Sequence, residues 1–96
     1  MASNVAIDQL IVSTPGVCGG RPRVAGRRIT VEDIAIWHDA LGLSADQIAS
    51  EYDLTLTEIY AALTYYFANR EEMDQSIREG EKFVEEMRKA SLTPDK

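Results

Sequence analysis

The fold is decided by residues 44–67, SADQIASEYDLTLTEIYAALTYYF, which predict two short helices joined by a tight turn. Ser44 is a good N-cap for the first helix, and Gln47, three residues later, completes a capping box. Apolar residues then recur on one face at helical spacing, at Ile48, Ala49 and Tyr52. The stretch therefore begins with a short amphipathic helix.

The turn and the second helix come directly after it. Asp53 and Leu54 make the turn, either Thr55 or Thr57 is the next N-cap, and Glu58 lies in the new first turn. The apolar stripe of the second helix is formed by Ile59, Ala62, Leu63 and either Tyr66 or Phe67. Two such helices joined by a turn of about three or four residues predict a helix-turn-helix.

The N-terminal part predicts extended structure. Residues 5–13 mix β-branched residues with a polar centre and predict a strand that ends at residues 14–16. Residues 21–31 predict a second extended segment, so we expect an N-terminal β-hairpin or arm. Gly19 and Gly20 indicate a connection that needs positive φ. An anion-binding loop is the weaker interpretation, because the Lys and Ser or Thr of a phosphate loop are absent there.

A further helix precedes the helix-turn-helix. Thr30 is its N-cap, Asp33 lies at the capping-box position, and Gly42 occupies the C′ position. Its expected core face consists of Val31, Ile34, Trp37 and Leu41, widened by Ile36 and Ala40. With the helix-turn-helix, this gives a three-helix core.

The C-terminal part predicts a highly charged helix over residues 71–91, after a break or bend at residues 68–70, with the alternative that the preceding helix runs straight through them. It carries a thin heptad-like apolar seam of Met73, Ile77, Val84 and Met87, with Gly80 in the gap and Phe83 beside it. So polar a helix does not stand alone and should dock on a second subunit, another protein or the rim of the core. We therefore expect a mainly α fold with two parts: residues 1–70 form the arm plus helix-turn-helix, and residues 71–96 the amphipathic helix and tail.

Composition and charge limit the classes of function. The chain has 96 residues, a net charge of −6 and one Cys, which indicates a single domain without an internal disulfide. It shows neither a secretory signal nor an apolar run of the roughly 18–20 residues that a membrane helix needs, so we expect a cytoplasmic protein. Residues 1–30 carry a net +3, residues 31–67 carry seven acids and no Lys or Arg, and residues 68–96 carry −2.

Several motifs together resemble the bacterial family called domain of unknown function 433. The matching positions are Pro15, Gly19, Gly20, Pro22, Val24, Gly26, Arg28, Ile29, Val31, Gly42, Ser44, Tyr52, Leu56, Ala61, Ala62, Leu63, Tyr65 and Tyr66. The resemblance covers about residues 7–80. It implies an arm-bearing or winged helix-turn-helix module, similar to VapB-type antitoxins that pair with a PIN-like nuclease toxin. The family often has Gly-Thr-Arg where this chain has Gly26-Arg27-Arg28, a change that adds a cation to the arm.

Two interpretations of the four arginines in residues 21–28 remain open. They contact DNA as an arm, or they solubilise the hairpin and pair with the acidic helices of the same chain. The outward side of the second helix of the pair supplies uncharged candidates for base contacts. The predicted DNA-binding residues are Arg21, Arg23, Arg27, Arg28, Thr55, Thr57, Tyr60 and Thr64; the predicted partner-binding residues are Met73, Ile77, Phe83, Val84 and Met87.

The functional prediction is an antitoxin-like regulator. It would form a homodimer, bind double-stranded operator DNA to repress its own operon, and neutralise a PIN-like nuclease toxin through its C-terminal helix. The alternative is a protein-interaction module with a helix-turn-helix shape and no DNA binding, which the acidic segment 31–67 favours. We expect no enzyme, no cofactor and no metal site, because Cys18 and His38 are distant in sequence and no cluster of ligands surrounds either residue.

Overall fold

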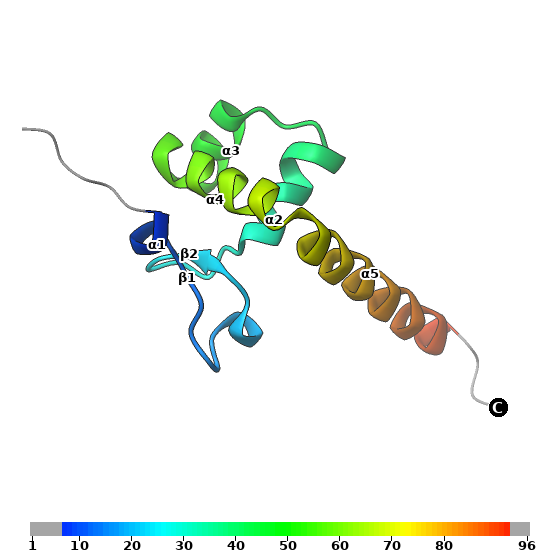
Figure 1. Ribbon diagram of the computed structural model, residues 1–96. Helices are drawn as coiled ribbons and strands as arrows, with labels where there is room; N and C mark the ends of the chain where they lie inside the picture. Colours follow the sequence, from blue (N-terminus) through cyan, green and yellow to red (C-terminus); the bar gives the residue numbers. More distant parts are fainter. Residues whose placement is uncertain (1–6, 93–96) are drawn as a thin grey trace, which may run out of the picture.

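The structure, a computed structural model, describes residues 7–92 and is mainly helical (Figure 1). In Figure 1 the short elements and α2 to α4 form one body, and α5 projects away from it. The elements in chain order are α1 (Ile7–Leu10), β1 (Ile11–Val12), η1 (Cys18–Gly20), β2 (Arg23–Val24), α2 (Val31–Ala35), η2 (Ile36–Ala40), α3 (Ala45–Tyr52), α4 (Leu56–Ala68) and α5 (Arg70–Leu92).

The predicted N-terminal hairpin is confirmed. β1 pairs antiparallel with β2, and Ile11 lies opposite Val24. The connection contains Gly19 at φ 66° and Gly20 at φ 77°, the left-handed conformations that the two glycines predict.

The extent of the first strand was predicted wrongly. Residues 7–10 form the single helical turn α1, and only Ile11 and Val12 are extended. Because Ile7 and Leu10 are three residues apart, a helical turn brings both to one side, and Leu10 packs against the core. Residues 5 and 6 of the predicted strand lie outside the described residues.

Three capping boxes fix the starts of the helices. Each joins an N-cap hydroxyl to the N3 backbone N–H and the N3 side chain to the N-cap backbone N–H. The predicted pairs at Thr30 and Ser44 are confirmed, and Thr55 rather than Thr57 caps α4. The three boxes are Thr30 with Asp33, Ser44 with Gln47, and Thr55 with Glu58.

The helix after Thr30 changes geometry halfway. It is α-helical through Ala35 and then forms a π-helical turn, in which the N–H of Leu41 donates to the carbonyl of Ile36 at 3.0 Å. A π turn fits an extra residue into the turn and so rotates the side chains that come after it about the helix axis. Leu41 is consequently 64% exposed and not part of the core face as predicted, and Ala40 is exposed as well. Gly42 ends this helix at φ 74°, as its C′ position predicts.

The core is built around α4, which packs against α2, α3, the hairpin and α1. The sequence left open whether Tyr66 or Phe67 completes the apolar stripe of α4. Tyr66 does, because it is buried, whereas Phe67 is 51% exposed. Beside the core, Trp37 stacks on Tyr52 with ring centroids 3.8 Å apart. The buried apolar residues are Ile11, Val24, Val31, Ile34, Ala35, Ala45, Ile48, Leu54, Ile59, Ala61, Ala62, Leu63, Tyr66 and Met73.

The predicted break between α4 and α5 lies at Asn69. Its backbone (φ −125°, ψ 38°) is not helical, and its side-chain amide donates to the carbonyl of Tyr65 at 3.0 Å. α5 therefore leaves the body in a new direction. Between residues 7 and 92, no helix combines the length and the apolarity that crossing a membrane requires.

Candidate functional site

Of the four arginines in residues 21–28, two stabilise the fold through hydrogen bonds to their own chain. The guanidinium of Arg23 donates to the hydroxyl of Thr14 at 3.2 Å and to the carbonyl of Arg27 at 2.9 Å, inside the hairpin. The guanidinium of Arg27 donates to the carbonyls of Tyr52 at 2.7 Å and Asp53 at 2.9 Å. Because these are the last carbonyls of α3, Arg27 caps that helix and ties the hairpin to the turn of the helix-turn-helix.

The other two arginines face solvent. Arg21 is exposed and forms an ion pair with Glu32 at 3.7 Å. The exposed side chain of Arg28 forms no hydrogen bond or ion pair with any of residues 7–92. The four residues therefore do not form one free cationic arm, and Arg28 is the most available of them.

The outward side of α4 carries an uncharged strip, the α4 ridge, formed by Thr57, Tyr60, Thr64 and Phe67. All four are exposed, and their spacing of three, four and three residues places them on one face of the helix. The hydroxyl of Thr55 accepts the Glu58 N–H as the cap and so has a structural role. α2, α3 and α4 contain no Lys or Arg, so these helices bring no cation to the α4 ridge.

The apolar seam of α5 is divided between two environments. Met73 is 5% exposed and lies in the core of its own chain, and Ile77 is half-buried against that core. As a partner-binding residue Met73 was predicted wrongly, because the start of α5 folds back onto the body. The rest of the seam, which we call the α5 ridge, is exposed: Phe83 by 62%, Val84 by 55% and Met87 by 54%.

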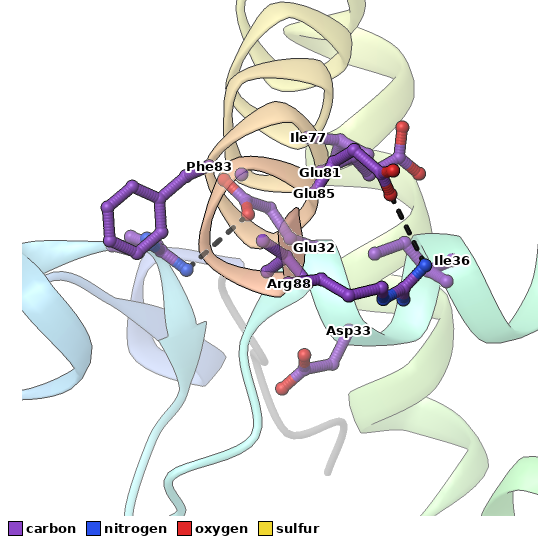
Figure 2. A pocket seen from close by; sticks show the side chains of 11 residues that line it. Glu32, Asp33, Ile36, Ile77, Glu81, Phe83, Glu85 and Arg88 are labelled. Carbon is purple, nitrogen blue, oxygen red and sulfur yellow. Dashed lines mark hydrogen bonds and ion pairs between the residues drawn. The ribbon is translucent and has the colours of Figure 1, made fainter. Parts of the chain in front are cut away.

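A groove of about 490 Å³ runs beside the α5 ridge, between α5 and α2, with Arg21 at its edge. Figure 2 shows Glu32 of α2 and Ile36 of η2 on the body side of this α5 groove, and Ile77 and Phe83 on α5. It is lined by Arg21, Glu32, Asp33, Ile36, Ile77, Gly80, Glu81, Phe83, Val84, Glu85 and Arg88.

Glu32 connects the two sides of the α5 groove. Although it is only 7% exposed, it accepts a hydrogen bond from the hydroxyl of Ser76 and pairs with Arg21. One carboxylate thus joins α2, α5 and the hairpin connection. No sequence pattern predicts this role, since Glu32 and Ser76 are 44 residues apart and only the fold brings them together.

A second polar cluster fixes the direction of α5. The hydroxyl of Tyr66 donates to Asp74 at 2.5 Å, and Cζ of Arg70 lies 5.4 Å from the centre of the Tyr66 ring and its Nε lies 3.4 Å from Oδ2 of Asp74. Burial and the bond to Asp74 raise the pKa of the Tyr66 hydroxyl, and the same bond lowers the pKa of Asp74. α5 is therefore anchored on α4 by Tyr66 and on α2 by Glu32.

Cys18 and His38, the two residues considered for catalysis, contact different parts of the chain and not each other. The thiol of Cys18 donates weakly to the carbonyl of Arg28 at 3.5 Å, and Nδ1 of His38 lies 2.8 Å from the carbonyl of Leu43. Across the described part of the chain, no three His, Cys, Asp or Glu side chains are grouped to bind a metal ion. The interaction surfaces, the α4 ridge and the α5 ridge with its groove, are the candidate sites.

Comparison with known proteins yields one family and one solved structure. The profile of the family described as "Protein of unknown function (DUF433)" matches residues 11–66. The crystal structure of a DUF433 member protein from Anabaena variabilis ATCC 29413 is 34% identical, with a TM-score of 0.67. That similarity covers 72% of this chain and 68% of the other. No curated protein matches the chain.

Proposed function

This chain belongs to the DUF433 family, and we propose that it is an antitoxin-like binding protein that holds another protein through α5. The observation that carries the proposal is the α5 ridge. Three large apolar side chains, each more than half exposed, lie close together on a helix that projects from the body. Small soluble proteins rarely leave such a strip open unless it binds something.

The chemistry of α5 favours a protein partner with a basic surface. The outer side of the helix is rich in carboxylates, among them Glu71, Glu72, Glu79 and Glu86, all exposed. Such a helix attracts a basic face over a distance, and its apolar ridge then supplies the buried contact. We take a PIN-like nuclease, whose RNA-binding face is basic, as the class of partner, because the VapB-type antitoxins that the sequence motifs resemble pair with such nucleases.

The test is co-purification with the product of a neighbouring nuclease gene. Phe83→Ser combined with Val84→Ser should remove the nuclease from the complex and restore its activity, because the apolar contact is lost. Leu41→Ser is the matched control: Leu41 is 64% exposed, close to the 62% of Phe83, but lies at the end of η2 and not on α5. Equal capture by the ridge variant and the control would contradict the proposal.

Operator binding is the second candidate function, and the α4 ridge favours it. Thr57, Tyr60 and Thr64 are exposed on the second helix of the helix-turn-helix, where such folds read base edges. Of the four arginines in residues 21–28, Arg28 is the one whose side chain forms no hydrogen bond or ion pair with residues 7–92, so it is available to hold a phosphate. Because seven acids and no cation lie in residues 31–67, DNA affinity should be weak and strongly dependent on salt.

Two variants test operator binding. The first is the single substitution Arg28→Gln, and the second, the α4 variant, combines Thr57→Ala with Tyr60→Ala. Arg28→Gln should weaken binding to all sequences alike and reduce its salt dependence, whereas the α4 variant should reduce preference for the operator. Arg23 and Arg27 are unsuitable for this test, because both serve the fold. Absence of operator binding even at low salt would remove this candidate and leave the binding of a protein partner.

A further inference from the structure

We propose that the α5 groove and the α5 ridge also bind α5 of a second copy of this chain, antiparallel, with Gly80 at the crossing. The inference rests on the proposed function in one respect: both assign docking to α5, so a second copy and the nuclease are alternative occupants of the α5 ridge, and the pair forms when no nuclease is bound. It adds the identity of one occupant and the geometry of the contact.

Gly80 points to a second helix. Glycine in the middle of a helix lowers helix stability relative to alanine, so its presence needs a reason. Nothing within the described residues supplies one: a Cβ at Gly80 would meet no atom within 4 Å. Yet Gly80 lines the α5 groove beside Val84, where a small residue lets another helix approach closely.

The seam of α5 is self-complementary when two copies run antiparallel. With the two-fold axis beside Lys82, Gly80 of one copy lies opposite Val84 of the other. In the same register Ile77 lies opposite Met87, so Val84 of the second copy meets the gap at Gly80 and its Met87 meets an apolar residue. This alternation of a and d positions is the packing of an antiparallel coiled coil.

Charge favours the same direction. Residues 70–81 carry two cations and five acids, a net −3, whereas residues 82–92 carry three cations and two acids, a net +1. An antiparallel pair sets each acidic half against a basic half, and a parallel pair sets like against like. Glu32 and Asp33 add two further carboxylates to the groove that would receive the basic end.

The part of α5 that remains uncovered is the part that such a pair would cover. Met73 and Ser76 bind the body of their own chain, through the core and through Glu32. From Phe83 on, every described side chain of α5 through Ser91 is exposed. The second copy would therefore cover the free half of α5 while each body keeps its own first half.

The first experiment is sedimentation equilibrium on the full chain from micromolar to submillimolar concentration. Wild type should be a dimer, and Gly80→Leu should raise its dissociation constant at least about tenfold. The same substitution should leave the fold intact and the helix content equal or higher, since a Cβ at Gly80 meets no atom within 4 Å in the monomer and leucine favours helix more than glycine does. Gln75→Leu, an exposed position of α5 outside the seam, is the control and should remain dimeric.

The second experiment reads the direction of the pair. In a Cys18→Ser background, Ile77→Cys mixed with Met87→Cys should form a disulfide-linked heterodimer on oxidation. Each variant alone should not, because the antiparallel register separates like positions by about 15 Å along the axis, beyond disulfide reach. Efficient cross-linking of Met87→Cys with itself would instead indicate a parallel pair and overturn the inference.

The other outcomes also decide. A wild-type chain that is monomeric throughout the range, or a dimer that Gly80→Leu leaves unchanged, would overturn the inference. Neither result touches the proposed function, which is judged by capture of the nuclease. Conversely, a dimer with the predicted cross-link and no nuclease complex would support this inference and count against the proposed function.

Discussion

Replacing Arg27 by Ala should destabilise the whole fold, although the position resembles a DNA contact. Its guanidinium donates to the carbonyls of Tyr52 and Asp53, the last acceptors of α3. Hydrogen bonds from a charged donor contribute about 1.5–3 kcal/mol each when buried, and Arg27 is half-exposed, so we take about 1 kcal/mol for each of the two. The expected loss in the free energy of unfolding is about 2 kcal/mol, or about 10 °C in Tm for a domain of this size.

Chemical denaturation followed by circular dichroism measures this loss. Arg28→Ala is the control, since the side chain of this neighbouring arginine forms no hydrogen bond or ion pair within the described chain and its removal should change stability by less than about 0.5 kcal/mol. Arg27→Lys should recover less than half of the loss, because an ammonium lacks the planar fork that reaches two carbonyls.

The outcome that would refute this reasoning is equal stability of Arg27→Ala and Arg28→Ala. The bonds to α3 would then contribute nothing in solution. Loss of operator binding in Arg27→Ala without loss of stability would restore Arg27 to the arm that the sequence predicts.

Three further predictions concern the core and the helix ends. Met73→Ala should lower the free energy of unfolding by about 2–4 kcal/mol independently of protein concentration, because Met73 fills the core of its own chain; denaturation at two concentrations checks this. Tyr66→Phe should cost about 1 kcal/mol at neutral pH. Since the pKa of Tyr66 is raised in the fold, its contribution is complete below the ordinary tyrosine pKa and is lost as pH rises through the raised value, so alkaline titration of stability should be flatter in Tyr66→Phe. Asp53→Gly should raise stability by about 0.5–1 kcal/mol, seen as a higher Tm, because Asp53 is left-handed at φ 56° and places a negative charge at the C-terminal end of α3.

The helix starts were predictable because their causes are local. A capping box joins residues three apart, so Thr30 and Ser44 were identified from the order of the residues alone, and the N-cap of α4 was narrowed to Thr55 or Thr57. Where local preference and packing disagree, prediction failed. The segment 7–10 has β-branched and apolar residues but forms a helical turn against the core.

The candidate sites were predictable only in part, because helical spacing gives a face but not its neighbours. The seam of α5 was identified from spacing, yet Met73 and Met87 look equivalent in the sequence. The break at Asn69 and the bond between Ser76 and Glu32 decide which of the two is buried. Arginine is similarly ambiguous, since one cation serves a cap or a phosphate depending on which acceptors lie within reach.

By itself, the stretch 44–67 determined a capped helix pair and its tight turn, since both depend on residues within a few positions of each other. Only the tertiary structure decided which residues outside this stretch contact it and which stay exposed. It set Arg27 against carbonyls 25 and 26 residues away and covered the first half of α5 while leaving Phe83 and Val84 open. Such contacts depend on how whole elements pack, and packing is a property of the complete chain that no local pattern records.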